Sequence, residues 1–362
     1  MALSHEIVEQ ALAGWIEPAL GVDLVSAGAV QQLDVAGSRV SLALQLDFPA
    51  GRYRDELASE LARHLSAACG EAVAVDLALA WAVPSATVQR GLLPFASIRN
   101  IVAVASGKGG VGKSTTAVNL ALALAQEGAK VGILDADIYG PSQPRMLGLS
   151  GRPVSHDNKT MEPMEAYGVK CMSIGFLVDE DQPMVWRGPM VTQALTQLLN
   201  ETNWGELDYL VVDMPPGTGD TQLTMSQRVP LAGAVIVTTP QDIALLDARR
   251  GLQMFRKVNV NVLGLVENMS THVCSNCGHE EHIFGAGGGE KMAAQYNARL
   301  LGSLPLDIRI REETDSGRPT VIADPESRIA ADYRAIARAA AAELARDAKT
   351  GEAFPEIIED DS

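Results

Sequence analysis

The chain has few cysteines, no excess of basic residues and no long apolar run. Its 362 residues include four cysteines, and 29 Lys and Arg stand against 45 Asp and Glu, giving a formal net charge of −16. The negative charge argues against a general nucleic-acid binder, and in a reducing cytosol the cysteines are not expected to form a disulfide framework. No stretch approaches the ~20 apolar residues of a membrane span, and the first residues lack a signal-peptide pattern. We therefore expect a cytoplasmic protein with neither nucleic acid nor membrane as a partner.

A glycine-rich loop is the strongest pattern that the sequence does contain. Residues 107–115 read Gly-Lys-Gly-Gly-Val-Gly-Lys-Ser-Thr, after the apolar run 101–106 and before the helix-forming run 116–125. A strand, a glycine loop and a helix in this order indicate a nucleotide site, where Lys113 neutralises phosphate charge and the Ser114 hydroxyl binds Mg²⁺. The second lysine of the loop is not required by this pattern. The residues expected to bind the nucleotide here are Gly107, Lys108, Gly109, Gly110, Val111, Gly112, Lys113, Ser114 and Thr115.

Three aspartates follow two further strand patterns. The apolar run that begins at residue 209 ends in Asp213, and the run that begins at residue 130 ends in Asp135, with Asp137 two positions later. Ligands bind at the carboxyl ends of strands in open α/β sheets, so Asp213 is a candidate carboxylate for the metal. Asp135 or Asp137 is a candidate to orient the attacking water in phosphoryl transfer. The proline- and glycine-bearing loop 214–220 is suited to respond to a γ-phosphate.

Two of the cysteines form a C-x-x-C pair, Cys274 and Cys277, and His279 and His282 follow closely. Chemistry alone leaves three interpretations. The four side chains can bind one zinc ion, or two chains can share a [4Fe–4S] cluster to which each gives two thiolates. The third interpretation is an unligated or redox-active pair on a surface loop.

Patterning along the chain predicts two folded units. Residues 1–85 read as a small α+β domain, 86–94 as a linker, 95–346 as a P-loop ATPase domain and 347–362 as an acidic tail. In the larger unit, strands alternate with helices, which predicts a mostly parallel twisted sheet with helices on both faces. We expect the first helix over Ser4–Trp15 and the last over Ser327–Arg346.

The motifs of residues 95–345 together resemble the Mrp/ApbC family of iron–sulfur cluster carrier ATPases. This family belongs to the deviant P-loop class, which also holds the MinD/ParA and nitrogenase iron-protein groups. The resemblance rests on the glycine loop, the C-x-x-C pair, Leu134–Ser142, Trp186–Pro189, Asp213–Asp220 and Glu267–Ser270, in the family's order. It implies a slow ATP hydrolase that binds ATP and Mg²⁺, holds a [4Fe–4S] cluster at a homodimer interface and transfers it to apo-proteins. A cluster assembly scaffold is an implied second partner.

The resemblance also assigns roles to residues. Lys108 resembles the signature lysine that reaches across a dimer to the partner's nucleotide, and Asp137 resembles the aspartate that positions water, with Asp135 behind it near the metal. Asp213 resembles the Walker B carboxylate. An adenine-reading edge is implied for Asn268, Pro305 and Asp307, and cluster ligation for Cys274 and Cys277.

The first 85 residues resemble the small domain that is fused to many bacterial members of the family. The matching stretches are Ile16–Asp23 and Asp47–Gly51, but the cysteine of the family's turn is absent. We therefore expect this domain to have a docking or structural role. A nucleotide-switched zinc-binding scaffold and a partitioning-type ATPase are the alternative functions, although the acidic C-terminus offers no amphipathic or basic element for the latter.

Overall fold

The computed structural model describes residues 3–89, 91–177, 188–274 and 276–351. Two expectations concern residues outside this range: Trp186 and Arg187 of one motif, and most of the acidic tail. Over the described residues, no helix is long and apolar enough to cross a membrane.

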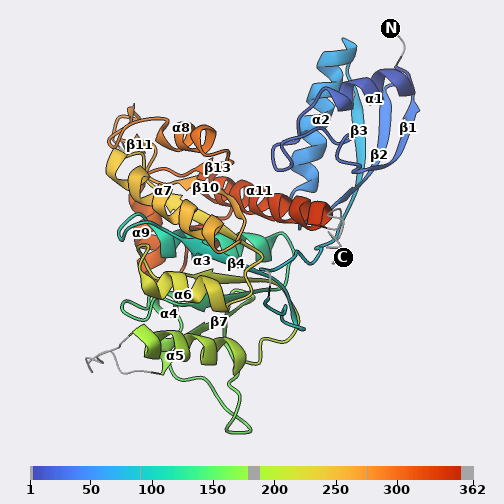
Figure 1. Ribbon diagram of the computed structural model, residues 1–362. Helices are drawn as coiled ribbons and strands as arrows, with labels where there is room; N and C mark the ends of the chain where they lie inside the picture. The colour runs from blue at the N-terminus through green and yellow to red at the C-terminus, as the bar shows by residue number, and fades with distance from the viewer. Residues whose placement is uncertain (1–2, 90, 178–187, 275, 352–362) are drawn as a thin grey trace, which may run out of the picture.

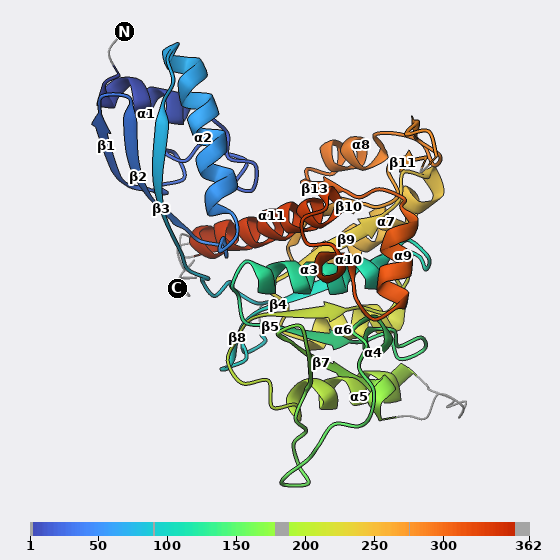
Figure 2. The ribbon, with the colours of Figure 1, turned by 180° about the vertical axis from the view of Figure 1, so that it is seen from behind.

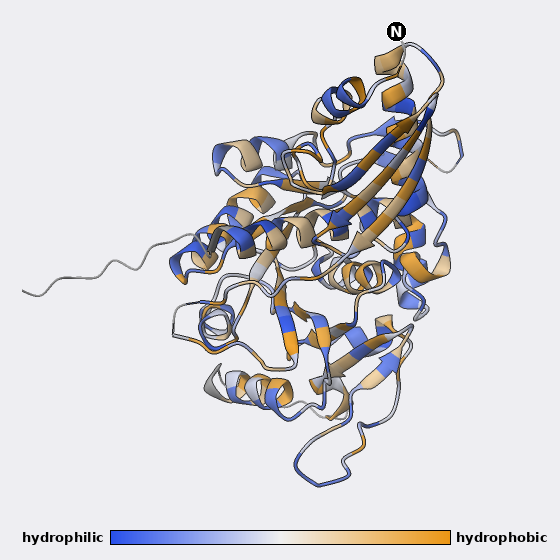
Figure 3. Cartoon of the chain, turned by 90° about the vertical axis from the view of Figure 1, so that its right-hand side faces the viewer, coloured by the Kyte–Doolittle hydropathy of each residue, from blue (hydrophilic) through white to orange (hydrophobic). Residues whose placement is uncertain are grey.

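A small sheet and two helices form the N-terminal unit (Figure 1). Strand β2 pairs with β1 as an antiparallel hairpin and with β3 in parallel. Polar and apolar residues alternate along these strands (Figure 3), so that one face of the sheet packs on the helices. Helix α2 contributes Leu57, Leu61 and Leu65 to this core at four-residue spacing. The elements are α1 (His5–Ala13), β1 (Val30–Ala36), β2 (Arg39–Leu46), α2 (Arg54–Cys69) and β3 (Ala74–Trp81).

The second unit is built on a sheet of eight strands over the described residues, in the order β13-β10-β9-β4-β8-β5-β7-β6. All neighbouring strands are parallel except β6, which runs antiparallel to β7 at the edge. The central strands are buried along almost their whole length, as expected for a sheet that is covered on both faces. The strands are β4 (Ile98–Ala105), β5 (Val131–Asp135), β6 (Met164–Ala166), β7 (Val169–Ser173), β8 (Leu207–Asp213), β9 (Gly233–Thr238), β10 (Val262–Glu267) and β13 (Leu300–Ser303).

Helices cover both faces of this sheet. Helices α3, α10 and α11 pack on one face, whereas α6, α7 and α8 lie on the other (Figures 1 and 2). A short ladder of β11 (His272–Val273) and β12 (Glu280–Glu281) extends beyond the end of β10. The remaining helices are α3 (Lys113–Gln126), α4 (Gln143–Met146), η1 (Ile174–Phe176), α5 (Gly188–Asn200), α6 (Asp220–Arg228), α7 (Asp242–Lys257), α8 (Gly288–Gln295), α9 (Ile308–Asp315), α10 (Thr320–Ala323) and α11 (Arg328–Gly351).

The expected fold class is confirmed, and two helix boundaries are corrected. The first helix begins after Ser4, whose hydroxyl accepts a hydrogen bond from the Ile7 amide, and it ends before Gly14 rather than at Trp15. The last helix continues to Gly351 instead of ending at Arg346, and Lys349 in this extension pairs with Asp47 of the small unit.

A buried charge cluster joins the small unit to the larger one. The Arg338 guanidinium on α11 pairs with Glu127 at 2.9 Å and lies 4.0 Å from the ring centre of Tyr53. Glu127 also accepts a hydrogen bond from the Arg52 amide at 2.9 Å, and the Tyr53 hydroxyl donates to Glu17 at 2.7 Å. Since Arg338 is only 5% exposed and Glu127 is fully buried, this contact fixes the small unit against the C-terminal end of α3 and the middle of α11.

Candidate active site

The glycine loop lies between β4 and α3 and leaves no room for side chains at two positions. A Cβ atom at Gly107 would lie 2.1 Å from the carbonyl carbon of Asp247 on α7. Gly112, with φ +84°, precedes Lys113 at the start of α3, and a Cβ atom there would meet the Asn268 amide nitrogen at 2.2 Å. Glycine is therefore required where the loop packs against α7 and the end of β10.

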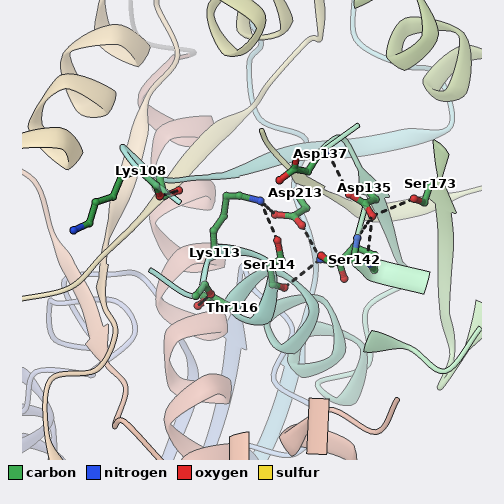
Figure 4. Close-up of polar contacts among 12 residues, drawn as sticks. Lys108, Lys113, Ser114, Thr116, Asp135, Asp137, Ser142, Ser173 and Asp213 are labelled. Atoms are coloured by element: carbon green, nitrogen blue, oxygen red, sulfur yellow. Dashed lines mark hydrogen bonds and ion pairs between the residues drawn. The ribbon is translucent and has the colours of Figure 1, made fainter. Parts of the chain in front are cut away.

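The Lys113 ammonium lies against the Asp213 carboxylate in the centre of the site (Figure 4). It also donates to the Ser114 hydroxyl at 3.1 Å. Gln143 connects the same groups, because its side-chain amide donates to Asp213 at 2.8 Å and to the Ser114 carbonyl at 3.1 Å. Lys113 is 6% exposed and Asp213 is fully buried, so this ion pair is shielded from water.

Asp135 lies beside Asp213, because the two residues end neighbouring strands in register. Its carboxylate accepts hydrogen bonds from the amides of Ser142 at 2.9 Å and Gln143 at 3.0 Å, and from the Ser173 hydroxyl at 3.1 Å. Burial, reinforced by the negative charge of Asp213, raises the pKa of Asp135 to about 7. Two buried carboxylates thus share one lysine, and this arrangement favours the binding of a further cation.

Asp137 and Lys108 lie at the margin of this cluster. The backbone amide of Asp137 donates to Asp135 at 3.2 Å, and burial raises the pKa of the half-buried Asp137 carboxyl. Lys108 points away from Lys113 (Figure 4), and its ammonium donates to the Gln241 side chain at 3.4 Å. Within one chain, therefore, Lys108 does not join the group around Asp213.

The three residues expected at the adenine edge surround one cavity. Asn268, Pro305 and Asp307 line a space of about 160 Å³ together with Gly112 and Thr115 of the glycine loop. The Asn268 amide donates to the carbonyl of residue 111 in that loop at 2.9 Å. Asp307 caps α9 and pairs with Arg309 at 2.7 Å, and the hydrogen bond from Arg309 holds the pKa of this carboxyl below its usual value.

The cysteine pair lies on the turn between β11 and β12. Cys277 is exposed and Cys274 is half-buried, and both are free thiols. The backbone N–H groups of Asn276 and Cys277 lower the pKa of Cys274, which favours its thiolate. The turn is closed by hydrogen bonds in both directions, from the Gly278 amide to the Cys274 carbonyl at 2.8 Å and from the Cys274 amide to the His279 carbonyl at 2.9 Å.

The structure does not assemble the four-residue zinc site. The Nδ1 atom of His282 is 2.8 Å from the Ser270 carbonyl oxygen and is engaged there. Among the residues that the structure describes, no three His, Cys, Asp or Glu side chains gather as a metal site. Both cysteines therefore lie on one turn, and the described part of their own chain supplies no further metal ligand beside them.

Four residues that contact the expected site residues were not predicted from the sequence. Ser142 ends the Leu134–Ser142 motif and Gln143 follows it, but no role was expected of either, and Ser173 and Gln241 lie far from the loop in sequence. Their contacts exist because the strand ends meet at one edge of the sheet.

A phosphate-type glycine loop at the carboxyl edge of a mostly parallel sheet, with a lysine, a hydroxyl and two carboxylates, defines a P-loop NTPase. The chain belongs to the family described as NUBPL iron-transfer P-loop NTPase, whose model matches residues 97–341. Residues 5–77 match a second family, described as iron–sulfur cluster assembly protein.

Similar proteins share much of the chain. An iron–sulfur cluster carrier protein of Escherichia coli K12 is 51% identical over 339 residues, which cover 93% of this chain and 92% of that protein. The carrier protein of Pseudomonas fragi is 66% identical over 67% of this chain and 85% of its own. The iron–sulfur cluster transfer protein NUBPL of Mus musculus is 57% identical over 67% of this chain and 77% of its own.

Solved structures agree with this fold. A nucleotide-binding protein of Archaeoglobus fulgidus in complex with ADP is 38% identical, with a TM-score of 0.57, and the match covers 66% of this chain and 91% of that one. The septum site-determining protein MinD of Pyrococcus horikoshii, at 23% identity and a TM-score of 0.50 over 66% and 94% of the chains, shares the fold alone.

Proposed function

We propose that the chain is a slow ATP hydrolase that carries a [4Fe–4S] cluster between two copies of itself and delivers it to apo-proteins in the cytoplasm. One observation supports the link between nucleotide and cluster. The segment that leaves β10 first contacts the glycine loop through Asn268 and then leads to the cysteine turn, where His282 contacts Ser270 at 2.8 Å. A movement of the glycine loop therefore has a short path to Cys274 and Cys277.

The glycine loop and its lysine are suited to hold the phosphates of ATP. The N-terminus of α3 presents unpaired N–H groups and the positive end of its dipole, and Lys113 adds a full charge. The cavity beside Thr115, lined by Asn268, Pro305 and Asp307, supplies a place for the adenine.

The residues around Asp213 also fit Mg²⁺. The Ser142 hydroxyl and the side-chain amide oxygen (Oε1) of Gln143 are buried there without a hydrogen-bond partner, beside two carboxylates, and Mg²⁺ prefers such oxygen ligands. Ser114, Asp135 and Asp213 would hold the ion, which neutralises phosphate charge when it is bound. Asp137, at the open side of this group, orients the attacking water and accepts its proton.

The cysteine pair and Lys108 both need a second copy of the chain to act as proposed. The pair Cys274 and Cys277 supplies two thiolates, whereas a [4Fe–4S] cluster takes four ligands. Lys108 does not reach its own Lys113 group and is available to the nucleotide of a partner. ATP changes the spacing of the two cysteine turns only if it binds one dimer state better than the other.

The double variant Cys274→Ala/Cys277→Ala tests the carrier function. After anaerobic reconstitution with iron and sulfide, we expect it to lose the visible iron–sulfur absorbance, whereas Cys69→Ala keeps it as the control. Retention of full cluster content by the double variant would refute the proposal. Metal analysis of anaerobically purified protein that finds zinc without iron and sulfide would favour the zinc-binding scaffold instead.

A further inference from the structure

A sizeable pocket away from the nucleotide site lies between α7, α8 and the segment 284–288. This α7–α8 pocket has a volume of about 550 Å³, and its walls include the apolar side chains of Leu245, Phe284 and Met292. This volume is large enough for one or two side chains of another protein. None of its residues takes part in the ATP site described above.

The mouth of the pocket carries two cations. Arg249 and Lys291 are exposed in the lining, and neither forms an ion pair within the part of the chain that the structure describes. Arg249 instead lies over the Tyr296 ring, 5.3 Å from its centre. The lining also contains Asp242, which lies in the first turn of α7, where the helix dipole favours a negative charge. The pocket is therefore locally positive on a chain whose net charge is −16, and it selects for an acidic partner.

The rim of the pocket is apolar and adjoins the cysteine turn. Ile243, Leu246 and Ile283 are 70%, 55% and 51% exposed, which is unusual for side chains of this size. Ile283 follows directly on His282, and Figure 1 shows α7, α8 and β11 together at one end of the molecule. A protein that docks on this rim therefore lies beside the cysteine turn.

We propose that the α7–α8 pocket docks the recipient apo-protein through an acidic surface segment with one apolar anchor side chain. The anchor enters between Leu245 and Met292, while flanking carboxylates face Arg249 and Lys291. The proposal rests on the proposed carrier function, since it names the surface by which that carrier recognises its recipient. Electrostatic attraction of this kind speeds encounter and orients the recipient toward the cysteines.

The test is the binding of a fluorescently labelled ferredoxin, freed of its [4Fe–4S] cluster and chosen for its acidic surface, to the full-length protein. We expect the variant Arg249→Glu/Lys291→Glu to weaken the anisotropy-measured affinity by about tenfold or more. The control Arg250→Glu/Lys257→Glu makes the same charge change on α7 outside the pocket, and we expect it to weaken binding less than about twofold. Leu246→Ser, at an exposed position that tolerates substitution, should weaken binding by about threefold through loss of apolar contact.

Every result of this binding experiment either supports the docking proposal or contradicts it. Undiminished binding by the pocket variant, or equal weakening by pocket and control variants, would overturn the proposal. Loss of dimerisation in the pocket variant alone would assign the pocket to the second copy and overturn it as well. If the wild-type protein binds the apo-ferredoxin through the pocket but passes no cluster to it, the carrier function fails while the docking site stands.

Discussion

Gln143 contacts three separate parts of the nucleotide site. Its backbone amide donates to Asp135, and its side-chain amide donates to Asp213 and to the Ser114 carbonyl. These bonds keep two carboxylates of like charge at fixed positions next to the glycine loop. We interpret Gln143 as a positioning residue for the carboxylates that would hold Mg²⁺, since groups behind metal ligands set the orientation of those ligands.

The substitution Gln143→Met keeps the volume of the side chain but removes its amide. We expect Mg²⁺-dependent binding of ADP to weaken by about tenfold, because Asp213 loses a donor that orients it. Unfolding without nucleotide should become easier by about 1–3 kcal/mol, because a buried carboxylate oxygen is left unpaired. Calorimetric titration and thermal denaturation measure the two effects. ADP affinity equal to that of the wild type, with Mg²⁺ present, would contradict the role.

At the residue scale, the sequence predicts the groups that carry a local signal and misses those that do not. The glycine loop and the aspartates at strand ends are recognisable because each follows a strand pattern at a fixed distance. Gln143 and Ser173 belong to the site only because folding brings them next to the aspartates, and a single sequence does not contain that information. The roles of Lys108, Asp137 and the adenine-edge residues stay predictions.

At the scale of elements, long periodic segments are predictable and short ones are not. Helix α3 and strand β8 were expected close to their observed bounds. The two-residue strands β11 and β12 and the edge strand β6 are too short to produce a periodic pattern. The last helix was predicted too short because its end is held by contact with the small unit, including an ion pair of Lys349 with Asp47 at 2.5 Å.

The contact between α11 and α3 provides a test at this scale. Arg338→Ala leaves Glu127 buried without its guanidinium partner, and we expect a loss of about 3–5 kcal/mol in the free energy of unfolding. Lys349→Ala is the control, because it removes another ion pair of α11, with Asp47 of the small unit, but at an exposed position, for about 0–1 kcal/mol. Chemical denaturation measures both. Equal losses would mean that burial of the Arg338 pair does not stabilise the contact.

At the scale of the whole molecule, the fold class and the presence of a small N-terminal unit could be read from the order of strand and helix patterns. The homodimer stays a prediction that rests on the family resemblance, because the packing of one chain does not test it. The division at residues 85 and 95 also stays a proposal. Gln89, within the expected linker, donates to the Ser226 carbonyl at 2.7 Å, so that segment is packed against the larger unit.

Substitution of Lys108 tests whether this lysine acts on the nucleotide of a second chain in a dimer. Lys108→Ala should lower ATP turnover by about 100-fold or more while nucleotide binding remains, because a charge supplied in trans acts on the transition state. Lys113→Ala should be inactive because its own phosphate site is lost. Mixing the two inactive variants should restore activity in part, since a mixed dimer joins one intact phosphate site to an intact Lys108 of the other chain. Undiminished turnover by Lys108→Ala, or no recovery on mixing, argues against action in trans.

Helix α3 connects the nucleotide site directly to the contact with the small unit. It begins at Lys113 in the nucleotide site and ends beside Glu127, which contacts Arg52 and Arg338. Its 14 residues span roughly 21 Å. The phosphate-binding loop and the contact with the small unit therefore lie at the two ends of one helix. A displacement of this helix along its axis would reach both the nucleotide site and the small unit, which lies on the other side of the molecule from the cysteine turn (Figure 1).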